Sequence, residues 1–546
     1  MHGRIIKRKL VIEIPGKRIG DNRLHSRLTS KCYAKLRNFS VHSIVELNRR
    51  FSMIKDESQS QPGAVGQFDH DEIHPPRQPE PHDILNLISR FLESAGNVLL
   101  IQGPPGAGKT TLALELLGGI KATRMGRTEI PPTRLYVQSR VPPNKLRKHF
   151  PWIQEMHDPL SKNNRTDDST ESTDGIRISE ADDVFNKILT TKRSKLRGLL
   201  VIDSWEGALR NTSEDGRRMI ESAILSDPDE NKVGVVLVSE GGRIGELPNL
   251  VDGIVTLSAS ELDGRRLRTI AVNKLRGFRI KSDRALFSLD HGKFNLLSNT
   301  TFGDSAPSKP RILSPVQHTQ THFSTGSRDL DLMLNGGFRR GSSILVDVNT
   351  SIPTVGVRLL LRIIIANLVN QGGSSFIIPF STVSSDNLAE SMRPLVGDET
   401  LNQRVRIGEY DQDLPRKEWR VRLNGKVMDD FVVFANVWKE LVTTSSSIIL
   451  ALDFDRIVQI YGDDLMLPGL ANMSGKMRDA GAVTLAVASE KTKLREAFLR
   501  IADYSLKVER IDDTMVIYGV KPFTNIHGVE FSFEKGYPSL RLTEIV

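Results

Sequence analysis

The residues best suited to chemistry form one short run, GPPGAGKTT at positions 103–111. This run has the pattern G-x-x-x-x-G-K-T, in which glycines allow backbone N–H groups to surround a phosphate. The apolar stretch 97–102 before it predicts a buried strand, and the residues after it predict a helix, whose N-terminus favours an anion. Because the run lies between a strand and a helix, the sequence predicts a phosphate-binding loop.

The loop pattern assigns an expected role to each of its key residues. The Lys109 ammonium is expected at the β- and γ-phosphates, and the Thr110 hydroxyl is expected to ligate Mg²⁺. Asp203 ends the apolar stretch 198–202 and is expected to help hold the metal, although an aspartate at a strand end can also cap a helix. The expected cofactors are therefore ATP and Mg²⁺. The expected nucleotide-binding residues are Gly103, Pro104, Pro105, Gly106, Ala107, Gly108, Lys109, Thr110 and Thr111.

The elements around the loop alternate between short apolar runs and helical stretches. Such alternation predicts an α/β domain with a mostly parallel sheet flanked by helices. Strands are expected at 134–138, 198–203, 233–239, 253–257, 265–273 and 285–289, the last two as a terminal hairpin.

The same order of elements returns about 210 residues later, which predicts a domain duplication. At the loop position the second copy reads DVNTSIPTVGVR, without Gly-Lys-Thr. Asp347 there would repel a phosphate, and Pro353 has no N–H to donate. Asp453 and Asp455 are expected to be caps or groups at the core edge. The sequence thus predicts two tandem α/β domains, the second with a degenerate phosphate loop.

Composition limits the class of protein. Hydrophobic residues make up 38% of the chain and charged residues 26%, which is typical of a folded soluble protein. No apolar run reaches the roughly 18 residues of a membrane-spanning helix, and the N-terminus lacks the apolar stretch of a secretory signal. The single cysteine, Cys32, excludes a disulfide framework within one chain. We therefore expect a cytoplasmic protein with no membrane partner.

Positive charge is concentrated at the N-terminus. Residues 1–50 hold 13 Lys and Arg and three Asp and Glu, a net charge of +10, whereas the whole chain is +9. Such a segment can bind nucleic acid or an acidic partner, can be a solvated arm, or can precede a true start at Met53. The expected organisation is a basic tail (1–52), a linker (53–82), a first domain (83–297), a second linker (298–321) and a second domain (322–546).

Further motifs accompany the loop, namely VDGIV at 251–255, VNKLRG at 272–277 and FSTGSRDLDLMLNGGFRRG at 323–341. Together they resemble the RecA superfamily, and most closely its KaiC-like branch, over about residues 83–290 and more weakly over 322–535. The resemblance implies two tandem RecA-like domains. The segments YVQSRV, FPW and DSW, which begin at Tyr136, Phe150 and Asp203, are also similar to the archaeal gas-vesicle regulatory family GvpD.

The KaiC-like resemblance adds two basic residues to the expected site. It implies that Lys274 and Arg276 reach the γ-phosphate of a nucleotide held by a neighbouring subunit, where a cation stabilises the transferring phosphoryl group. This role implies a homo-oligomer, either a ring or a head-to-tail assembly. A basic strand end at the surface is the alternative interpretation of the same residues.

One departure from the family concerns the group that activates water. KaiC-like ATPases carry paired glutamates at the end of the second strand, whereas this chain has QSRV at 138–141. Glu206, three residues after Asp203, is the nearest candidate replacement, and Glu240, after the fourth strand, is another. Arg140 would contact phosphate or pair with Glu206. We therefore expect an ATPase with low turnover, or nucleotide binding without turnover.

Three functions follow from these observations. The first is a KaiC-like ATPase that acts as a nucleotide switch on a regulatory protein partner, including a transcription regulator. The second is a RecA-like DNA-binding ATPase that uses the basic tail. The third is a nucleotide-gated scaffold without turnover. The net charge of −1 after residue 50 argues against the folded body as a DNA-binding surface.

Overall fold

The computed structural model describes residues 84–546 except for 95, 121–122, 126–127, 131, 139–142, 156–176, 181–197, 211, 226–232, 242–246, 298–308, 381 and 463–472. The expected tail, the first expected linker and positions 139–141 therefore lie outside the described residues. All described residues belong to one compact unit, residues 78–546. The expected boundaries at 297 and 322 remain predictions.

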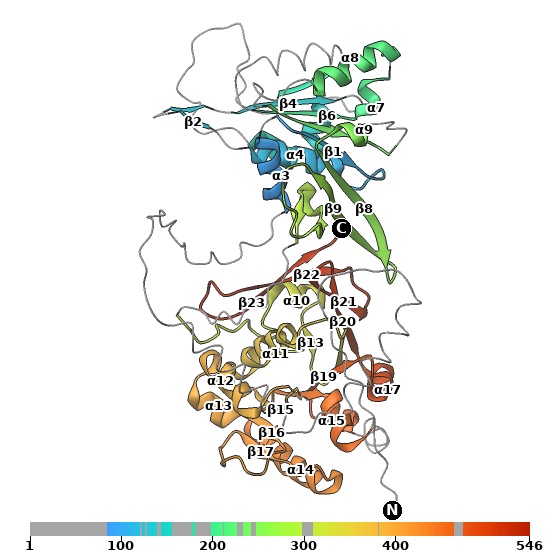
Figure 1. Cartoon of the computed structure of the whole chain (residues 1–546). Coiled ribbons are helices and arrows are strands. Elements are labelled where there is room, and N and C mark those ends of the chain that lie inside the picture. Colours follow the sequence, from blue (N-terminus) through green and yellow to red (C-terminus); the bar gives the residue numbers. More distant parts are fainter. Residues whose placement is uncertain are drawn as a thin grey trace, which may run out of the picture. The chain divides into compact units, whose positions relative to one another are not determined.

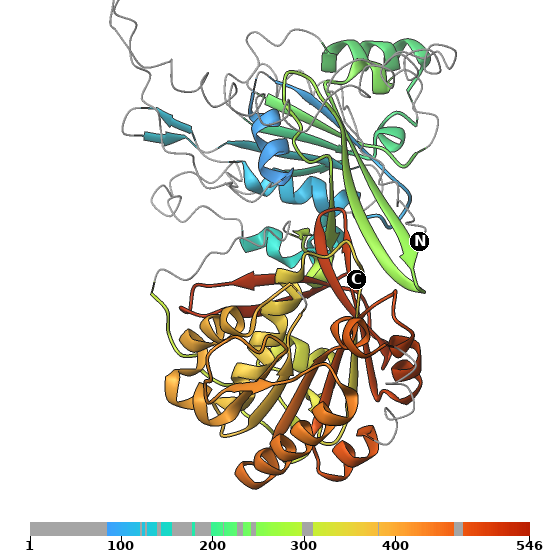
Figure 2. The ribbon, with the colours of Figure 1, turned by 60° about the horizontal axis from the view of Figure 1, so that its bottom comes forward.

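In the described part of the first half, nine strands form one sheet (Figure 1). In spatial order they are β11 (Asn295–Leu296), β10 (Arg284–Ser288), β9 (Arg265–Leu275), β8 (Gly253–Leu262), β1 (Val98–Gln102), β7 (Val233–Val238), β6 (Gly198–Asp203), β4 (Thr133–Gln138) and β5 (Arg177–Glu180). Neighbours from β8 to β5 are parallel, whereas β9 and β10 are antiparallel additions. The prediction of a mostly parallel sheet is confirmed. β8 and β9 extend beyond the expected strands and form a long antiparallel ribbon (Figure 2).

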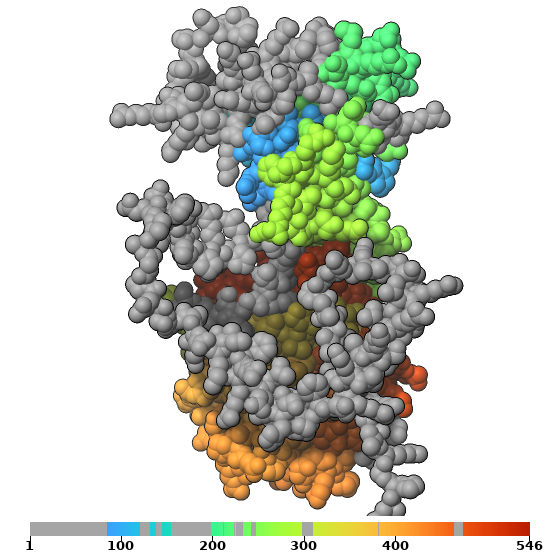
Figure 3. All heavy atoms as spheres, in the orientation of Figure 1, coloured from blue at the N-terminus to red at the C-terminus, as the bar shows by residue number. Residues whose placement is uncertain are grey.

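Both faces of this sheet are buried, which explains why its central strands are continuous apolar runs. Successive side chains of β1 point to opposite faces. Leu99 and Ile101 pack in one core with α3 (Ile84–Glu93) and α4 (Lys109–Gly119). Val98 and Leu100 pack in a second core with α8 (Glu214–Leu225). The outer side of α8, green in Figure 3, is exposed.

The second half repeats this arrangement with ten strands among its described residues. In spatial order they are β17 (Arg420–Arg422), β16 (Val405–Glu409), β15 (Ser374–Ile378), β18 (Ile448–Asp453), β19 (Val483–Ser489), β14 (Ser343–Val348), β20 (Tyr504–Ile511), β21 (Thr514–Lys521), β22 (His527–Ser532) and β23 (Ser539–Glu544). β14, β19, β18 and β15 are parallel neighbours, as β1, β7, β6 and β4 are. β20 to β23 correspond in the same way to β8 to β11. The predicted duplication is confirmed.

Helices cover both faces of the second sheet as well. On one face α11 (Thr354–Val369) and α12 (Ser385–Val396) enclose the core that contains Val346. On the other face α14 (Val427–Thr444), α15 (Phe454–Tyr461) and α17 (Lys493–Ile501) enclose the core that contains Leu345. No helix in the described part of the chain is both long enough and apolar enough to cross a membrane.

The remaining described elements are short. The helices are α5 (Pro143–His149), η2 (Pro151–Glu155), α7 (Trp205–Ala208), α9 (Leu247–Leu250), η4 (Asp290–Gly292), α10 (Arg328–Met333) and α13 (Asp398–Arg404). The strands are β2 (Thr123–Met125) with β3 (Thr128–Ile130), and β12 (His322–Phe323) with β13 (Phe338–Arg339).

A small apolar cluster joins the two sheets. Its buried members are Leu286, Leu297, Val516, Tyr518, Ile526 and Ile545. Beside it, the buried guanidinium of Arg265 donates to the carbonyl oxygens of Thr524 and Gly519 and lies 3.9 Å from the ring centre of Phe523. The β8–β9 ribbon of the first sheet therefore packs against the end of β21 in the second.

Candidate functional site

The phosphate loop connects β1 to α4, as predicted. Gly103 opens the loop with a φ of +153°, and a Cβ there would lie 2.3 Å from the carbonyl oxygen of Leu257 on β8. Only glycine allows the loop to pass this close to the neighbouring strand. Gly108 has a φ of +98° and immediately precedes α4, so the loop turns directly into the helix. The N-terminal N–H groups of α4 are thus placed as an anion site requires.

Lys109 is the first residue of α4 and is only 7% exposed. Its ammonium donates to the carbonyl oxygens of Gly103 and Pro104, at 2.7 and 2.9 Å, and so lies across the loop. Burial lowers the pKa of Lys109, and the charges of Glu240, Asp203 and Glu206 oppose that effect in that order. Three carboxylates therefore act on this ammonium in the described structure.

The predicted metal ligands, Thr110 and Asp203, lie together. The Thr110 hydroxyl donates to Asp203 Oδ2 at 2.7 Å, because β6 ends at the same edge of the sheet as β1. The short helix α7 is capped by the Ser204 side chain, which favours the metal role of Asp203 over a capping role. Burial raises the pKa of the Asp203 carboxyl, while hydrogen bonds and the Lys109 charge oppose this rise.

A hydroxyl and a carboxylate at this position fit Mg²⁺, which prefers oxygen ligands and keeps several waters. Within the described residues, no group of three or more His, Cys, Asp and Glu could hold a metal ion by itself. The fit is therefore to a metal held by Thr110 and Asp203 together with substrate phosphates, as in other phosphate-transfer sites.

Tyr136 is a residue of the candidate site that the sequence motifs did not predict. Its buried hydroxyl donates to Asp203 Oδ2 at 2.5 Å, and burial together with the Asp203 charge raises the pKa of the phenol. The strand register could have revealed this contact. Gln138 on β4 lies opposite Asp203 on β6, and Tyr136 is two residues earlier on the same side of β4. The contact depends on β4 and β6 being neighbours, which a strand pattern alone does not fix.

Replacing Tyr136 with phenylalanine should weaken Mg²⁺ binding about tenfold, because groups that orient a metal ligand typically contribute at least that much to affinity. The measurement is a Mg²⁺ titration in the presence of a fluorescent ATP analogue. The matched control is Tyr410→Phe, which removes a half-buried tyrosine hydroxyl from the second domain. Equal Mg²⁺ dependence of Tyr136→Phe and the wild type would mean that the phenol only fills the core.

Glu206, the expected water-activating residue, is held by hydrogen bonds. Its carboxylate accepts from the Ser239 hydroxyl and, at 3.2 Å, from the backbone N–H of Glu240. In the second domain the Asp455 carboxylate accepts at 3.2 Å from the backbone N–H of Ser489, at the matching strand end. Because this contact recurs in a domain without a phosphate loop, it points to a structural contribution. A catalytic role for Glu206 remains a prediction.

Lys274 and Arg276 lie away from the phosphate loop of their own chain. Lys274 pairs with Ile254 near the end of β9, and Arg276 follows Leu275, the partner of Gly253. This part of β9 lies beside the beginning of β1, whereas the loop follows the end of β1. The Lys274 ammonium donates to the Val251 carbonyl at 2.6 Å, and Arg276 forms an ion pair with Asp252 at 2.8 Å. A role at a phosphate would therefore require a loop from another subunit, as the resemblance implied.

The second domain has an ion pair near the end of β14, the strand that corresponds to β1. The Arg495 guanidinium on α17 forms two hydrogen bonds to the Asp347 carboxylate, one of them from Nε to Oδ1 at 2.8 Å. Backbone N–H groups of the following loop are bonded within it, as Ser351 and Ile352 both donate to Asn349. Asp453 caps α15. The prediction of a degenerate phosphate loop is confirmed.

Comparison with known proteins agrees with this geometry. Residues 93–299, which include the phosphate loop and the first sheet, match the family model described as ATPase: KaiC. The first half of the chain carries a KaiC-like ATPase domain. The resemblance inferred from the phosphate loop and the motifs at 251–255 and 272–277 is thereby confirmed.

The similarity extends beyond the KaiC-like domain. The chain is 22% identical over 529 residues to Protein GvpD1 and 25% identical over 490 residues to Protein GvpD2, both from Halobacterium salinarum. Each alignment covers 84% of this chain and 95% of the relative. An alignment of this extent includes residues of both domains, so the predicted similarity to GvpD is also confirmed.

Proposed function

We propose that the protein is an ATP-dependent regulatory switch. ATP with Mg²⁺ binds at the phosphate loop of the KaiC-like domain, and slow hydrolysis changes the contacts that the protein makes with a partner. The observation that carries this proposal is the Thr110–Asp203 contact of 2.7 Å beside the buried ammonium of Lys109. A KaiC-like ATPase domain implies nucleotide binding, and this contact provides the hydroxyl and the carboxylate that Mg²⁺ needs.

The residues of the candidate site each have a proposed part in ATP binding or hydrolysis. Loop N–H groups and the N-terminus of α4 bind the phosphates, and Lys109 leaves its loop carbonyls to contact the β- and γ-phosphates. Thr110 and Asp203 hold Mg²⁺, which neutralises charge on the phosphates. Tyr136 keeps the Asp203 carboxylate oriented. Glu206 is the proposed group that accepts a proton from the attacking water, and its existing hydrogen bonds favour slow turnover.

We propose a homo-oligomer in which Lys274 and Arg276 act on the nucleotide of a neighbouring subunit. Arg276 supports this assembly because its side chain is 62% exposed. It lies at the end of the strands opposite to the phosphate loop of its own chain. Transition-state charge on a phosphoryl group is stabilised by such a cation. The proposed output is cytoplasmic and regulatory, on a protein partner such as a transcription regulator. Similarity to the GvpD proteins across both domains supports a joint role for the two halves.

ATP binding and steady-state ATP turnover, measured on the same sample of the full chain, test this function. We expect binding together with turnover below about 1 s⁻¹, the low end for enzymes. Turnover should exceed that of a Lys109→Ala control. Absence of ATP binding would contradict the proposal.

Binding without turnover would instead support a nucleotide-gated scaffold, the second candidate function. The hydrogen bonds that Ser239 and Glu240 donate to the Glu206 carboxylate favour this candidate, because they leave that carboxylate less available as a base. A DNA-binding ATPase would show affinity that falls steeply with salt and is lost on removal of residues 1–52.

A further inference from the structure

Arg268 on β9 connects the phosphate loop to the end of the second domain. Its Nη1 donates to the carbonyl oxygen of Gly106 in the loop at 2.9 Å, and its Nε donates to the main-chain oxygen of Val546. The residue is only 5% exposed. One buried guanidinium therefore joins the phosphate loop to the segment that follows β23.

The duplicated fold supplies an internal comparison for Arg268. Lys274 pairs with Ile254 on β8, and in the second copy Lys521 pairs with Ser505 on β20. Counting back from these lysines, Arg268 corresponds to Met515, a buried residue of β21. The fold thus accepts an apolar side chain at this position. Because a buried charge is costly, the cation in the loop-bearing copy calls for a reason beyond packing.

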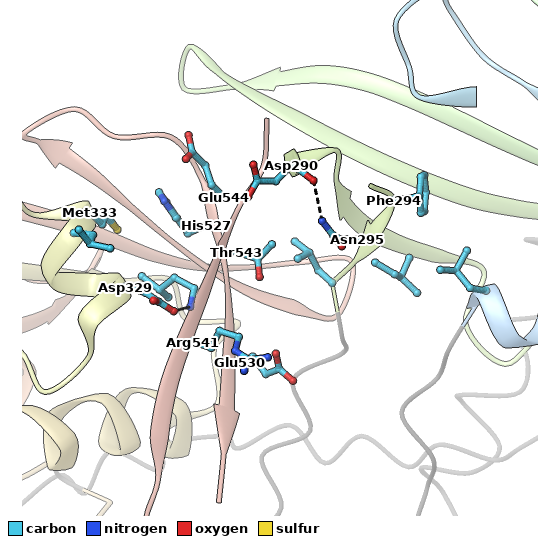
Figure 4. Close-up of a pocket in the computed structure, with 15 residues that line it drawn as sticks. Asp290, Phe294, Asn295, Asp329, Met333, His527, Glu530, Arg541, Thr543 and Glu544 are labelled. Atoms are coloured by element: carbon cyan, nitrogen blue, oxygen red, sulfur yellow. Dashed lines mark hydrogen bonds between the residues drawn. The ribbon is translucent and has the colours of Figure 1, made fainter. Parts of the chain in front are cut away.

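The chain end that Arg268 contacts is anchored to both domains. The Ser288 hydroxyl donates to the Glu544 carbonyl and accepts from the Asp290 N–H, and Ile545 lies in the apolar cluster that joins the two sheets. Figure 4 shows Glu544 and Asp290 next to each other at the rim of a cavity of about 880 Å³. β23 is tied to the second domain through its pairing with β22 and through Asp329 of α10, which accepts from the Leu542 N–H.

A second contact reaches the loop from the same region. A Cβ added to Gly108 would lie 3.0 Å from the side chain of Leu289, the residue after Ser288. Gly106 thus contacts Arg268 of β9, and Gly108 contacts Leu289, which directly follows β10. Ser288, the last residue of β10, holds segment 544–546 through its bond to Glu544. Short, buried contacts therefore connect the phosphate loop to the end of β23.

We propose that Arg268 is a positioning residue that couples nucleotide binding at the loop to the β23 edge of the second domain. The inference rests on the proposed function, because it requires that the loop binds ATP. When phosphates draw the loop N–H groups and Lys109 toward them, the Gly106 carbonyl is held by Arg268, so that ordering of the loop orders segment 544–546. By thermodynamic reciprocity, a partner that binds this edge changes the affinity of the loop for ATP. The second domain thereby regulates ATP binding at the phosphate loop.

Hydrogen–deuterium exchange of the full chain, with and without ATP and Mg²⁺, tests the coupling. We expect ATP to slow amide exchange in β23 at least about fivefold, the lower end of typical allosteric coupling. Arg268→Met, which installs the residue of the second copy, should reduce this effect below about twofold while weakening ATP binding only about two- to tenfold, as for one lost hydrogen bond. Arg266→Met, which removes an exposed arginine from the same strand, should retain the full effect.

If Arg268 had only a structural role, its replacement would lower the stability of the protein without removing the ATP-dependent protection of β23 from amide exchange. If Arg268→Met retains that protection, the coupling role is wrong. Should Arg268→Met fail to fold, Arg268→Lys provides the same test, because a lysine keeps the charge but lacks the planar fork that reaches both main-chain oxygens. Wild-type protein that binds ATP without any change in β23 would overturn the inference alone. Wild-type protein that does not bind ATP would overturn the proposed function and the inference with it.

Discussion

Replacing Lys109 with alanine is expected to weaken ATP binding at least 100-fold. The variant loses a charge-assisted contact to two phosphates, and such contacts contribute about 1.5–3 kcal/mol each. It also loses the bonds that the ammonium makes to the Gly103 and Pro104 carbonyls, which organise the loop. Isothermal titration of the full chain with ATP in the presence of Mg²⁺ measures the effect.

Lys491→Ala is the matched control for Lys109→Ala. Lys491 is an exposed lysine beyond β19, near the degenerate loop of the second domain. Its replacement should leave ATP affinity unchanged within about twofold, because surface substitutions rarely matter by more than a few tenths of a kcal/mol. Tight ATP binding by Lys109→Ala, or a large loss in Lys491→Ala, would place the nucleotide outside the predicted loop.

Replacing Arg495 with alanine is expected to destabilise the second domain by about 2–4 kcal/mol, since it leaves a buried carboxylate without its partner. The Asp347 side chain is 7% exposed and that of Arg495 is 22% exposed, so the pair is largely shielded from water. Urea unfolding followed by fluorescence of Trp419 and Trp438, which lie in the second domain, measures the loss. ATP binding at the first domain should stay unchanged.

The double variant Arg495→Ala with Asp347→Asn separates charge from packing. Removing the unpaired charge should restore at least about half of the stability lost in Arg495→Ala, as expected when desolvation of a lone carboxylate dominates the loss. If Arg495→Ala has wild-type stability, or if it creates a second ATP site, the ion pair does not have the role assigned to it here.

Much of the fold was predictable because it depends on local patterns. The parallel strands are buried on both faces, so they appear as continuous apolar runs, and the run before residue 103 located β1 without knowledge of its neighbours. Thr110 and Asp203 could be paired in advance because the carboxyl ends of parallel strands meet at one edge of the sheet. The repeat of the strand order likewise predicted the second sheet.

Contacts between distant segments could not be predicted in the same way. Arg495 and Asp347 are separated by 148 positions, and no local pattern relates a charge on α17 to the end of β14. In the sequence, Arg268 is one of several basic residues of a charged hairpin. Its contact with Gly106 follows only from the position of β9 beside the phosphate loop. Tyr136 required the β4–β6 register. In each case the sequence specifies the strand or helix, and the tertiary arrangement specifies the partner.

The stoichiometry of ATP binding tests the central claim most directly. The claim is that the chain has one working nucleotide site. Lys109, Thr110 and Asp203 meet at the phosphate loop of the first domain, whereas the corresponding region of the second domain has the Arg495–Asp347 ion pair. Titration of the full chain with ATP and Mg²⁺ should give one nucleotide per chain. Two nucleotides per chain would show that the second domain also binds, and none would show that the phosphate loop does not serve ATP.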